Sequence, residues 1–335
     1  MRRGKGDAAT HSPYPITLQD IRAARERIGP YLQPTALRQY EPLNAVIGSG
    51  MQVFVKHENH NPTNAFKVRN AIAAMTMLSP DERRSGVIAA TRGNHGQGLA
   101  YAGRLLGIPV TICAPIGNNP EKNDAMRGYG AELIEAGSDY DEALEVVQQL
   151  THERGLTLLH GTNNRYILAG AGTIALEMVE QEPGLDAVVI AIGGGSQAVG
   201  ALTVLNALEP EARVYGVQAA GAAAIYESWK AGEPLAWPSA ETFADGVATR
   251  STYEMTFPAL LHGLAGFVTV TDTDIAEAVR LLLRTTHNLV EGAGACGLAG
   301  VIALREELAG QKIGIILSGG NMDQVTLRQV MTGEL

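Results

Sequence analysis

Short apolar runs alternate with helix-patterned segments along nearly all of this 335-residue chain, and this alternation constrains the fold most. Strands are predicted at residues 51–55, 86–90, 110–114, 131–135, 157–160, 187–192, 213–218, 267–270 and 313–317. Helices are predicted around them, at residues 18–31, 40–47, 65–78, 99–106, 121–129, 140–154, 167–180, 198–207, 272–286 and 291–308. Strands separated by helices pair in parallel through right-handed crossovers, so the pattern predicts an α/β protein with parallel sheets.

The composition argues against several classes of partner. There are 26 Lys and Arg residues against 35 Asp and Glu, and no basic stripe occurs, so nucleic acid is not expected to bind. No apolar run reaches the roughly 18 residues that a membrane helix needs, and residues 1–14 lack the apolar core of a secretory signal. Cys113 and Cys296 lack metal-ligand spacing and are predicted to be buried thiols. We expect a cytoplasmic protein of about two domains.

Lys67 is the first candidate for chemistry. It follows the turn-forming residues 59–64 and lies in the first turn of a mostly apolar predicted helix. An ammonium group kept out of water near the positive end of a helix has a lowered pKa. Such a lysine suits Schiff-base chemistry. The alternative is a lysine at a helix end whose stem is buried and whose amine reaches water.

Three polar, glycine-rich loops follow predicted strands, at the edge where open parallel sheets bind ligands. They span residues 91–97, 193–197 and 318–321. The second loop, Gly193-Gly194-Gly195-Ser196-Gln197, precedes a helix, and its backbone N–H groups can converge on an anion such as phosphate. Tight packing of a strand against a helix explains such a run equally well. The loop matches neither the Walker nor the Rossmann pattern, which disfavours a nicotinamide enzyme.

Five motifs, in order, carry a resemblance to a known family: Asn64-Ala65-Phe66-Lys67-Val68-Arg69, Gly93-Asn94-His95-Gly96-Gln97, the loop 193–197, Ala244-Asp245-Gly246 and Ser318-Gly319-Gly320-Asn321. From about residue 16 to residue 330 the chain resembles the fold-type II pyridoxal phosphate enzymes, in particular the threonine/serine dehydratase and serine racemase branch. The resemblance implies a tryptophan synthase β-like fold with two open, twisted, mostly parallel sheets flanked by helices. It implies a large cofactor domain (residues 1–75 and 158–335), a small mobile domain (residues 76–157) and a homodimer.

The same resemblance implies pyridoxal 5'-phosphate as the cofactor. Its expected ligands are Phe66, Lys67, Asn94, Gly193, Gly194, Gly195, Ser196, Gln197 and Ser318. Lys67 would link to the cofactor aldehyde, Phe66 would lie beside the ring, and Asn94 would hydrogen-bond the phenolic oxygen. The N–H groups of residues 193–197 would hold the phosphate. Ser318 would face the pyridine nitrogen, and because a hydroxyl leaves the ring a weaker electron sink than a carboxylate does, loss of a β-substituent is favoured over transamination.

The implied reaction is dehydration of a β-hydroxy amino acid, of the L-threonine or L-serine type, to a 2-oxo acid and ammonia. The substrate would be held by the loop that contains Thr91, Arg92, Asn94 and His95, which would receive its carboxylate. Free Lys67 would remove the α-proton. The β-hydroxyl would leave with a proton from Lys67 or from the cofactor phosphate.

Two regions depart from the pattern of this branch. Arg92 stands where serine is common, and in serine racemases that serine is the second acid/base, a role that an arginine fills poorly. Dehydration is therefore favoured over racemisation. Arg92 either meets a substrate anion, as in a 3-hydroxyaspartate dehydratase, or pairs with a local acid. Gln218 and Ala224 stand where metal-binding relatives carry acidic residues, so no divalent-metal site is expected.

The remaining polar residues have simpler interpretations. Four histidines lack metal-ligand spacing and are predicted to be structural, namely His57, His60, His160 and His287. Asp245 and Glu291 either cap helices and fix loops or contact the substrate. The chain ends soon after residues 318–321, which argues against a feedback-regulated biosynthetic deaminase. The competing functions are an amino-acid racemase, a β-replacement synthase and a catalytically silent ligand-binding protein.

Overall fold

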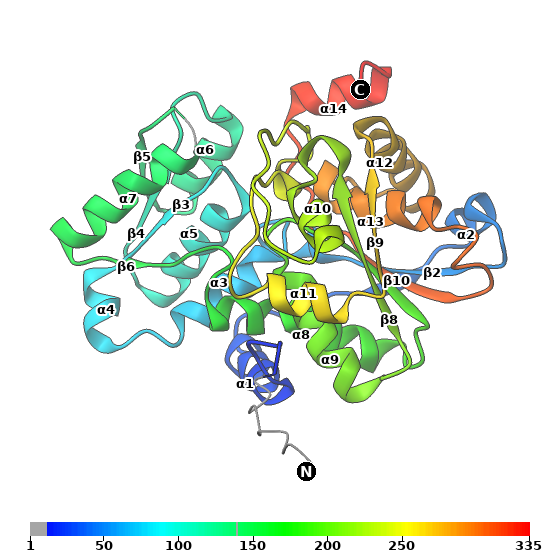
Figure 1. Ribbon diagram of the computed structural model, residues 1–335. Helices are drawn as coiled ribbons and strands as arrows, with labels where there is room; N and C mark the ends of the chain where they lie inside the picture. The colour runs from blue at the N-terminus through cyan, green and yellow to red at the C-terminus, as the bar shows by residue number, and fades with distance from the viewer. Residues whose placement is uncertain (1–11, 139) are drawn as a thin grey trace, which may run out of the picture.

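The computed structural model describes residues 12–138 and 140–335 and contains two sheets that lie side by side (Figure 1). The larger sheet has the order β1-β2-β10-β7-β8-β9 and the smaller sheet the order β5-β4-β3-β6. The strands of the larger sheet are β1 (Leu37–Gln39), β2 (Gln52–Lys56), β7 (Ala187–Ala191), β8 (Arg213–Ala219), β9 (Gly266–Val270) and β10 (Lys312–Ile316). Those of the smaller sheet are β3 (Val87–Ala90), β4 (Val110–Ala114), β5 (Glu132–Glu135) and β6 (Thr157–Leu158).

The pairing of these strands confirms the predicted fold class. β1 and β2 are antiparallel, whereas the other neighbouring pairs are parallel. The strands β3, β7 and β10 each lead directly into one of the three glycine-rich loops, so these loops meet at the carboxyl edges of the sheets. That residues 76–157 form a separate mobile domain remains a prediction.

Helices cover both sheets (Figure 1). The α-helices are α1 (Leu18–Ile28), α2 (Glu41–Ile47), α3 (Lys67–Met75), α4 (Pro80–Ser85), α5 (Asn94–Leu106), α6 (Pro120–Gly128), α7 (Tyr140–Arg154), α8 (Arg165–Gln181), α9 (Ser196–Leu208), α10 (Ala224–Ala231), α11 (Phe257–Gly263), α12 (Asp272–Thr286), α13 (Gly292–Ala303) and α14 (Gln324–Thr332). Three short 3₁₀ helices are η1 (Glu58–His60), η2 (Ala220–Ala222) and η3 (Asp245–Val247). None of the described helices is long and apolar enough to span a bilayer.

Several helix boundaries differ from those predicted. α5 begins at Asn94 and α9 at Ser196, earlier than the apolar pattern suggests, because packing holds glycine and polar residues in the helix at the start of α5 and polar residues at the start of α9. α13 ends at Ala303 rather than near residue 308. The sequence pattern also missed α4, α11 and α14. α4 buries no residue and α14 buries one, so neither shows an apolar stripe.

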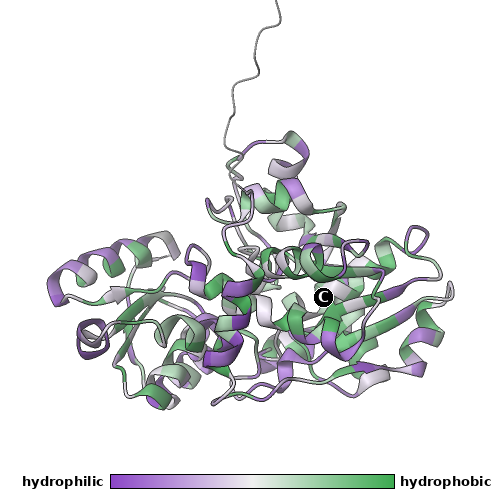
Figure 2. Cartoon of the chain, turned by 90° about the horizontal axis from the view of Figure 1, so that it is seen from below, coloured by the Kyte–Doolittle hydropathy of each residue, from purple (hydrophilic) through white to green (hydrophobic). Residues whose placement is uncertain are grey.

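The helix α3, which begins with Lys67, lies between the two sheets and packs against α5 and α8 (Figure 1). The apolar residues of α3 are buried in the largest hydrophobic cluster. A Cβ on Gly98 of α5 would lie 2.9 Å from the backbone carbon and oxygen of Lys67, so glycine lets α5 approach the start of α3. Figure 2 shows the strands as largely hydrophobic and many outer helical faces as hydrophilic. The two cysteines are buried free thiols, as predicted.

Candidate active site

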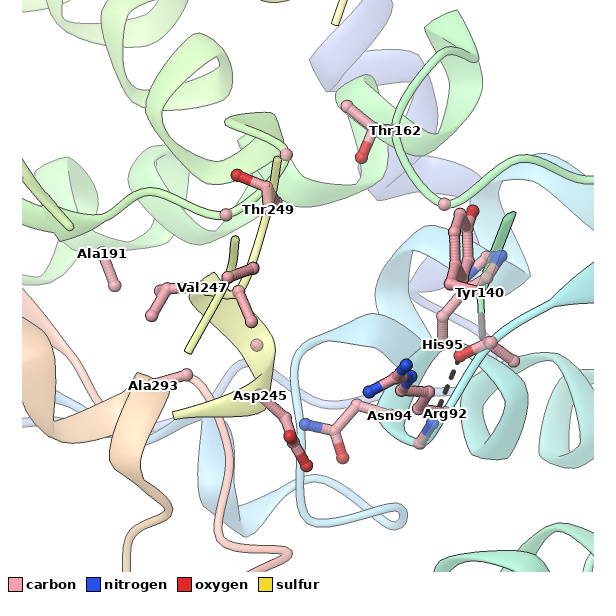
Figure 3. Close-up of a pocket in the computed structure, with 18 of the residues that line it drawn as sticks. Arg92, Asn94, His95, Tyr140, Thr162, Ala191, Asp245, Val247, Thr249 and Ala293 are labelled. Carbon is pink, nitrogen blue, oxygen red and sulfur yellow. Dashed lines mark hydrogen bonds between the residues drawn. The ribbon is translucent and has the colours of Figure 1, made fainter. Parts of the chain in front are cut away.

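A cavity of about 960 Å³ lies at the carboxyl ends of strands from both sheets. All the site residues predicted from the sequence line it, namely Phe66, Lys67, Thr91, Arg92, Asn94, His95, Gly193, Gly194, Gly195, Ser196, Gln197 and Ser318. Figure 3 shows Arg92 and Asn94 on the side formed by the smaller sheet and Asp245 on the facing side. The cavity therefore joins motifs that are up to 252 positions apart in the sequence, as between Phe66 and Ser318.

Lys67 lies in this cavity with little to satisfy its amine. Its Nζ donates one long hydrogen bond, of 3.3 Å, to the carbonyl oxygen of Gly161. It lies 5.0 Å from the centroid of the Phe66 ring. Burial lowers the pKa of Lys67 to about 8. About a tenth of this amine is therefore neutral at pH 7, against well under a thousandth for an exposed lysine. Lys67 is thus available as a nucleophile and as a base.

The loop 193–197 leads from β7 into α9 and has space for an anion but none for side chains. A Cβ on Gly193 would lie 2.2 Å from the carbonyl oxygen of Gly246, and one on Gly194 would lie 2.0 Å from the Thr162 hydroxyl. Within the described structure, the backbone N–H groups of this loop have no acceptor. The Nε2 of Gln197 is also buried without a partner. Unsatisfied donors at a helix N-terminus are suited to a phosphate.

The start of α5 offers a second set of backbone donors. His95 itself contributes no charge there, because its Nε2 donates to the Leu159 carbonyl oxygen at 2.9 Å and its Nδ1 is buried without a partner. Burial and the nearby Lys67 lower the pKa of His95 to about 3, so the ring is neutral. Any carboxylate bound by this loop would consequently rely on the N–H groups at the helix N-terminus rather than on the His95 ring.

Ser318 follows β10 and is tied to the lysine segment through the backbone. Its carbonyl oxygen accepts a hydrogen bond of 3.0 Å from the Phe66 N–H. Ala65 and Gly319 form an isolated bridge next to it. The side chain is almost buried, at 6% exposure, and lines the cavity. Its position relative to Lys67 is therefore fixed by main-chain contacts.

Arg92 lies on the cavity wall with its side chain exposed. Of its own polar groups, only the backbone carbonyl has a partner in the described structure, the Nδ2 of Asn118 at 3.1 Å. No carboxylate among the described residues lies within ion-pair distance of the guanidinium group. Both alternatives for Arg92, a substrate anion and a local acid, stay predictions.

Other residues of the cavity were left open or missed by the sequence patterns. Glu291 is the N-cap residue of α13, but its side chain makes no capping hydrogen bond and instead accepts one from Asn94 Nδ2 at 2.6 Å. Asp245 forms an ion pair with Lys122 of α6, a lysine that no motif indicated. His160, predicted to be structural, also lines the cavity, where its Nδ1 accepts hydrogen bonds from two backbone N–H groups. No metal-binding cluster of His, Cys, Asp or Glu is found among the described residues.

The residues of this cavity fit pyridoxal phosphate. The cofactor needs an amine that is neutral often enough to attack an aldehyde, and Lys67 has a pKa lowered to about 8. Its phosphate needs several donors, and residues 193–197 leave theirs without acceptors. The first glycines of that loop have no space for a Cβ, because Gly246 and Thr162 pack against them, so the loop meets the cavity with its backbone.

Comparison with known proteins agrees with this fit. The family model for pyridoxal-phosphate dependent enzymes matches residues 28–319. The L-threonine ammonia-lyase of Thermotoga maritima is 35% identical over 308 residues, which cover 92% of this chain and 76% of that protein. The L-threo-3-hydroxyaspartate ammonia-lyase of Saccharomyces cerevisiae is 32% identical over 95% of this chain and 97% of that protein. The structure of maize serine racemase matches with a TM-score of 0.90 at 31% identity, over 96% of this chain and 98% of that chain.

Proposed function

This chain belongs to the family of pyridoxal-phosphate dependent enzymes, and we propose on that basis that it is an ammonia-lyase for β-hydroxy amino acids. It would dehydrate a substrate of the L-threonine or L-serine type to a 2-oxo acid and ammonia. The observation that carries the proposal is the half-buried, nearly unpartnered amine of Lys67 beside a loop of unsatisfied N–H groups. The similarity to L-threonine ammonia-lyase supports the choice of reaction.

Different residues of the cavity would have different roles in this reaction. When bound, the cofactor supplies electron withdrawal from the bonds at the substrate Cα. The phosphate would be held by the N–H groups of residues 193–197, and the substrate carboxylate by the N–H groups at the start of α5. Neutral Lys67 takes the proton from Cα, and its ammonium form returns a proton to the departing β-hydroxyl. Ser318 supplies a neutral hydroxyl where the ring nitrogen would lie.

An assay of two products tests the reaction class. L-threonine and L-serine are incubated with the holoenzyme, and 2-oxo acid release is measured alongside formation of the D-enantiomers. We expect 2-oxo acid to be the main product. A racemase would give mainly D-amino acid, and a β-replacement synthase would respond to O-acetylserine with sulfide. A protein without the visible absorbance of bound cofactor would be a silent binding protein.

A second candidate is a 3-hydroxyaspartate ammonia-lyase, and Arg92 favours it. The exposed guanidinium on the cavity wall has no acidic partner among the described residues, so it is free to bind a second substrate carboxylate in the bidentate geometry that arginine prefers. The similarity to the yeast L-threo-3-hydroxyaspartate ammonia-lyase supports the same choice. An arginine here also argues against the racemase, because it cannot act as a base.

Variants of Arg92 separate the two substrates. If Arg92 binds a β-carboxylate, Arg92→Ser should lower kcat/KM for 3-hydroxyaspartate by roughly 10²-fold or more, while kcat/KM for L-threonine changes by less than about threefold. Arg92→Lys keeps the charge but loses the bidentate geometry. Its kcat/KM for 3-hydroxyaspartate should therefore lie between that of the parent enzyme and that of Arg92→Ser. Equal losses for both substrates would reject this role for Arg92.

The cellular context and assembly are also inferred from the family resemblance. We infer a cytoplasmic homodimer that does not bind nucleic acid and whose ligand is an amino acid. Light scattering coupled to size-exclusion chromatography measures the mass of the assembly directly. A monomer that is fully active would contradict the dimer.

A further inference from the structure

Two side-chain amides and one carboxyl group, from three separate segments, form a continuous chain of hydrogen bonds on one wall of the cavity. Asn94 is the first residue of α5, Asn321 follows β10, and Glu291 precedes α13. Asn321 Nδ2 donates to Asn94 Oδ1 at 2.8 Å, and Asn94 Nδ2 donates to Glu291 Oε1 at 2.6 Å. Figure 3 shows Asn94 between Arg92 and Asp245, directed into the cavity. The sequence left the role of Glu291 open between a structural contact and a substrate contact, and it gave no separate role to Asn321.

The direction of this chain is set by the backbone. Asn321 Nδ2 also donates to the carbonyl oxygen of Thr63 at 2.9 Å, and a carbonyl can only accept. At the other end of the same amide, Oδ1 accepts from Asn64 Nδ2 at 3.3 Å. The Thr63 carbonyl requires the nitrogen of Asn321 to lie where it can also donate to Asn94, and the Asn64 contact is compatible with this orientation. The amide of Asn321 therefore has one allowed orientation.

The orientation of Asn321 then determines that of Asn94. Because Asn321 offers a donor, Asn94 must present its oxygen on that side and its nitrogen toward Glu291. The reverse orientation would place two N–H groups against each other and an oxygen against the Glu291 carboxyl. An amide nitrogen carries two hydrogens. One is used by Glu291, so a single N–H of Asn94 remains for the contents of the cavity.

We propose that Glu291 and Asn321 are positioning residues that hold Asn94 as a hydrogen-bond donor to an acceptor oxygen of the bound cofactor. The family resemblance places the phenolic oxygen of pyridoxal phosphate next to Asn94, and that oxygen is an acceptor. A donor there stabilises the negative charge on the phenolic oxygen and so the form of the cofactor that absorbs visible light. The inference rests on cofactor binding and not on the identity of the substrate.

Two further observations agree with this role for Glu291. A Cβ on Gly319 would lie 2.6 Å from Glu291 Oε1 and 3.1 Å from Asn94 Nδ2, so the Ser-Gly-Gly-Asn motif leaves space for this contact. Burial is the largest effect on the pKa of Glu291 and raises it, although Lys122 and the Asn94 N–H act in the opposite direction. An amide at this position can still accept the same hydrogen bond, so Glu291→Gln preserves the contact with Asn94.

The test titrates apoprotein with pyridoxal phosphate in the absence of substrate. It measures the dissociation constant and the ratio of the visible to the near-ultraviolet absorbance band. Asn321→Asp replaces the donor to Asn94 with an acceptor, and Glu291→Leu removes the acceptor. We expect each to weaken cofactor binding by roughly tenfold or more and to reduce the visible band. Glu291→Gln keeps an acceptor oxygen and should stay within about threefold of the parent protein.

The outcomes separate positioning from a purely structural role. Parent-like binding and band ratio in both Asn321→Asp and Glu291→Leu would overturn the proposal, as would a loss in Glu291→Gln as large as that in Glu291→Leu. Thermal unfolding of each apoprotein identifies variants that fail to fold. If Glu291→Leu fails to fold, the nearly isosteric Asn321→Asp decides by itself. Because no substrate is present, a failure of the proposed lyase reaction would leave this result unchanged.

Discussion

Lys67 and Arg69 lie two residues apart on α3, and their environments differ completely. Arg69 is 1% exposed and donates to both oxygens of Glu58, at 2.7 and 2.9 Å, and to both oxygens of Glu177, at 2.6 and 2.9 Å. Lys56 adds a second cation to Glu177 at 2.7 Å. Lys67, on the cavity side, has one hydrogen bond of 3.3 Å. The same helix thus carries a fully paired buried charge and a nearly unpaired one.

This difference explains why the Arg69 side chain keeps its charge and the Lys67 side chain loses its proton more readily. Burial alone lowers the pKa of both side chains, but at Arg69 the carboxylates of Glu58 and Glu177 outweigh it and raise the pKa. At Lys67 nothing opposes burial, and the pKa falls to about 8. A buried charge with complete partners adds rigidity and no chemistry, whereas one without partners is poised to lose its proton. The ion cluster of Lys56, Glu58, Arg69 and Glu177 thereby fixes the helix that presents Lys67.

Removing the unpaired amine should have the largest effect on activity. Lys67→Ala is expected to lower kcat for 2-oxo acid release by about 10³-fold or more, because it removes both nucleophile and base. Borohydride reduction of the parent holoenzyme, followed by peptide mass spectrometry, should place the cofactor on residue 67. Lys122 provides a matched control, because it lines the same cavity but is paired with Asp245. Labelling of Lys122 instead, or an active Lys67→Ala variant, would show that Lys67 is not the lysine that binds the cofactor.

Removing the paired cation should have the largest effect on stability. Arg69→Met leaves Glu58 buried without a cation, while Lys56 still pairs with Glu177, so we expect the apoprotein to lose roughly 3–5 kcal/mol of unfolding free energy. Urea unfolding followed by circular dichroism measures this loss. Arg84→Met is the control, because the Arg84 side chain is 72% exposed in its ion pair with Asp81 and should contribute less than about 0.5 kcal/mol. Similar losses in both variants would mean that burial of the network contributes little.

Lys67 itself should reduce the stability of the apoprotein in a pH-dependent way. Its folded-state pKa of about 8 lies below the value of about 10.4 for an unfolded chain. Between these values the unfolded chain binds more protons, so the contribution of Lys67 to the unfolding free energy rises with pH across this window. Lys67→Met should therefore stabilise the apoprotein at pH 7 by roughly 1–3 kcal/mol, and the gain should fade above about pH 10. A pH-independent gain would assign the effect to packing.

The sequence indicated Lys67 as a candidate site residue, but it did not indicate the ion cluster around Arg69. The alternation of strands and helices and the five motifs indicated the fold and Lys67, because both signals are local along the chain. The buried cluster is not local, since Arg69 meets Glu177 across 108 positions. The contact of Asn94 with Glu291 spans 197 positions, so no spacing rule could distinguish a cap from a cavity residue. The early starts of α5 and α9 were missed because glycine and polar residues in a helix read as loop.

Gln218 is an uncharged buried side chain with hydrogen-bond partners, like the charged Arg69. Treatment with EDTA at this position has the smallest effect that we expect. The resemblance places it where metal-binding relatives have an acid, yet both the oxygen and the nitrogen of its buried amide have hydrogen-bond partners. Oε1 accepts from the N–H groups of Ile225 and Tyr226 at 3.2 and 3.0 Å, and Nε2 donates to Thr249 Oγ1 at 3.2 Å.

If hydrogen bonds to both ends of the amide mean a structural role, Gln218 holds the start of α10 and the strand β8 together without a metal. Treatment with EDTA should therefore change neither kcat nor the apoprotein melting temperature beyond error. Gln218→Ala should lower that melting temperature, because it leaves two buried N–H groups without an acceptor. If activity falls with EDTA and returns with Mg²⁺ or Mn²⁺, the enzyme binds a metal, and the structural role of Gln218 is wrong.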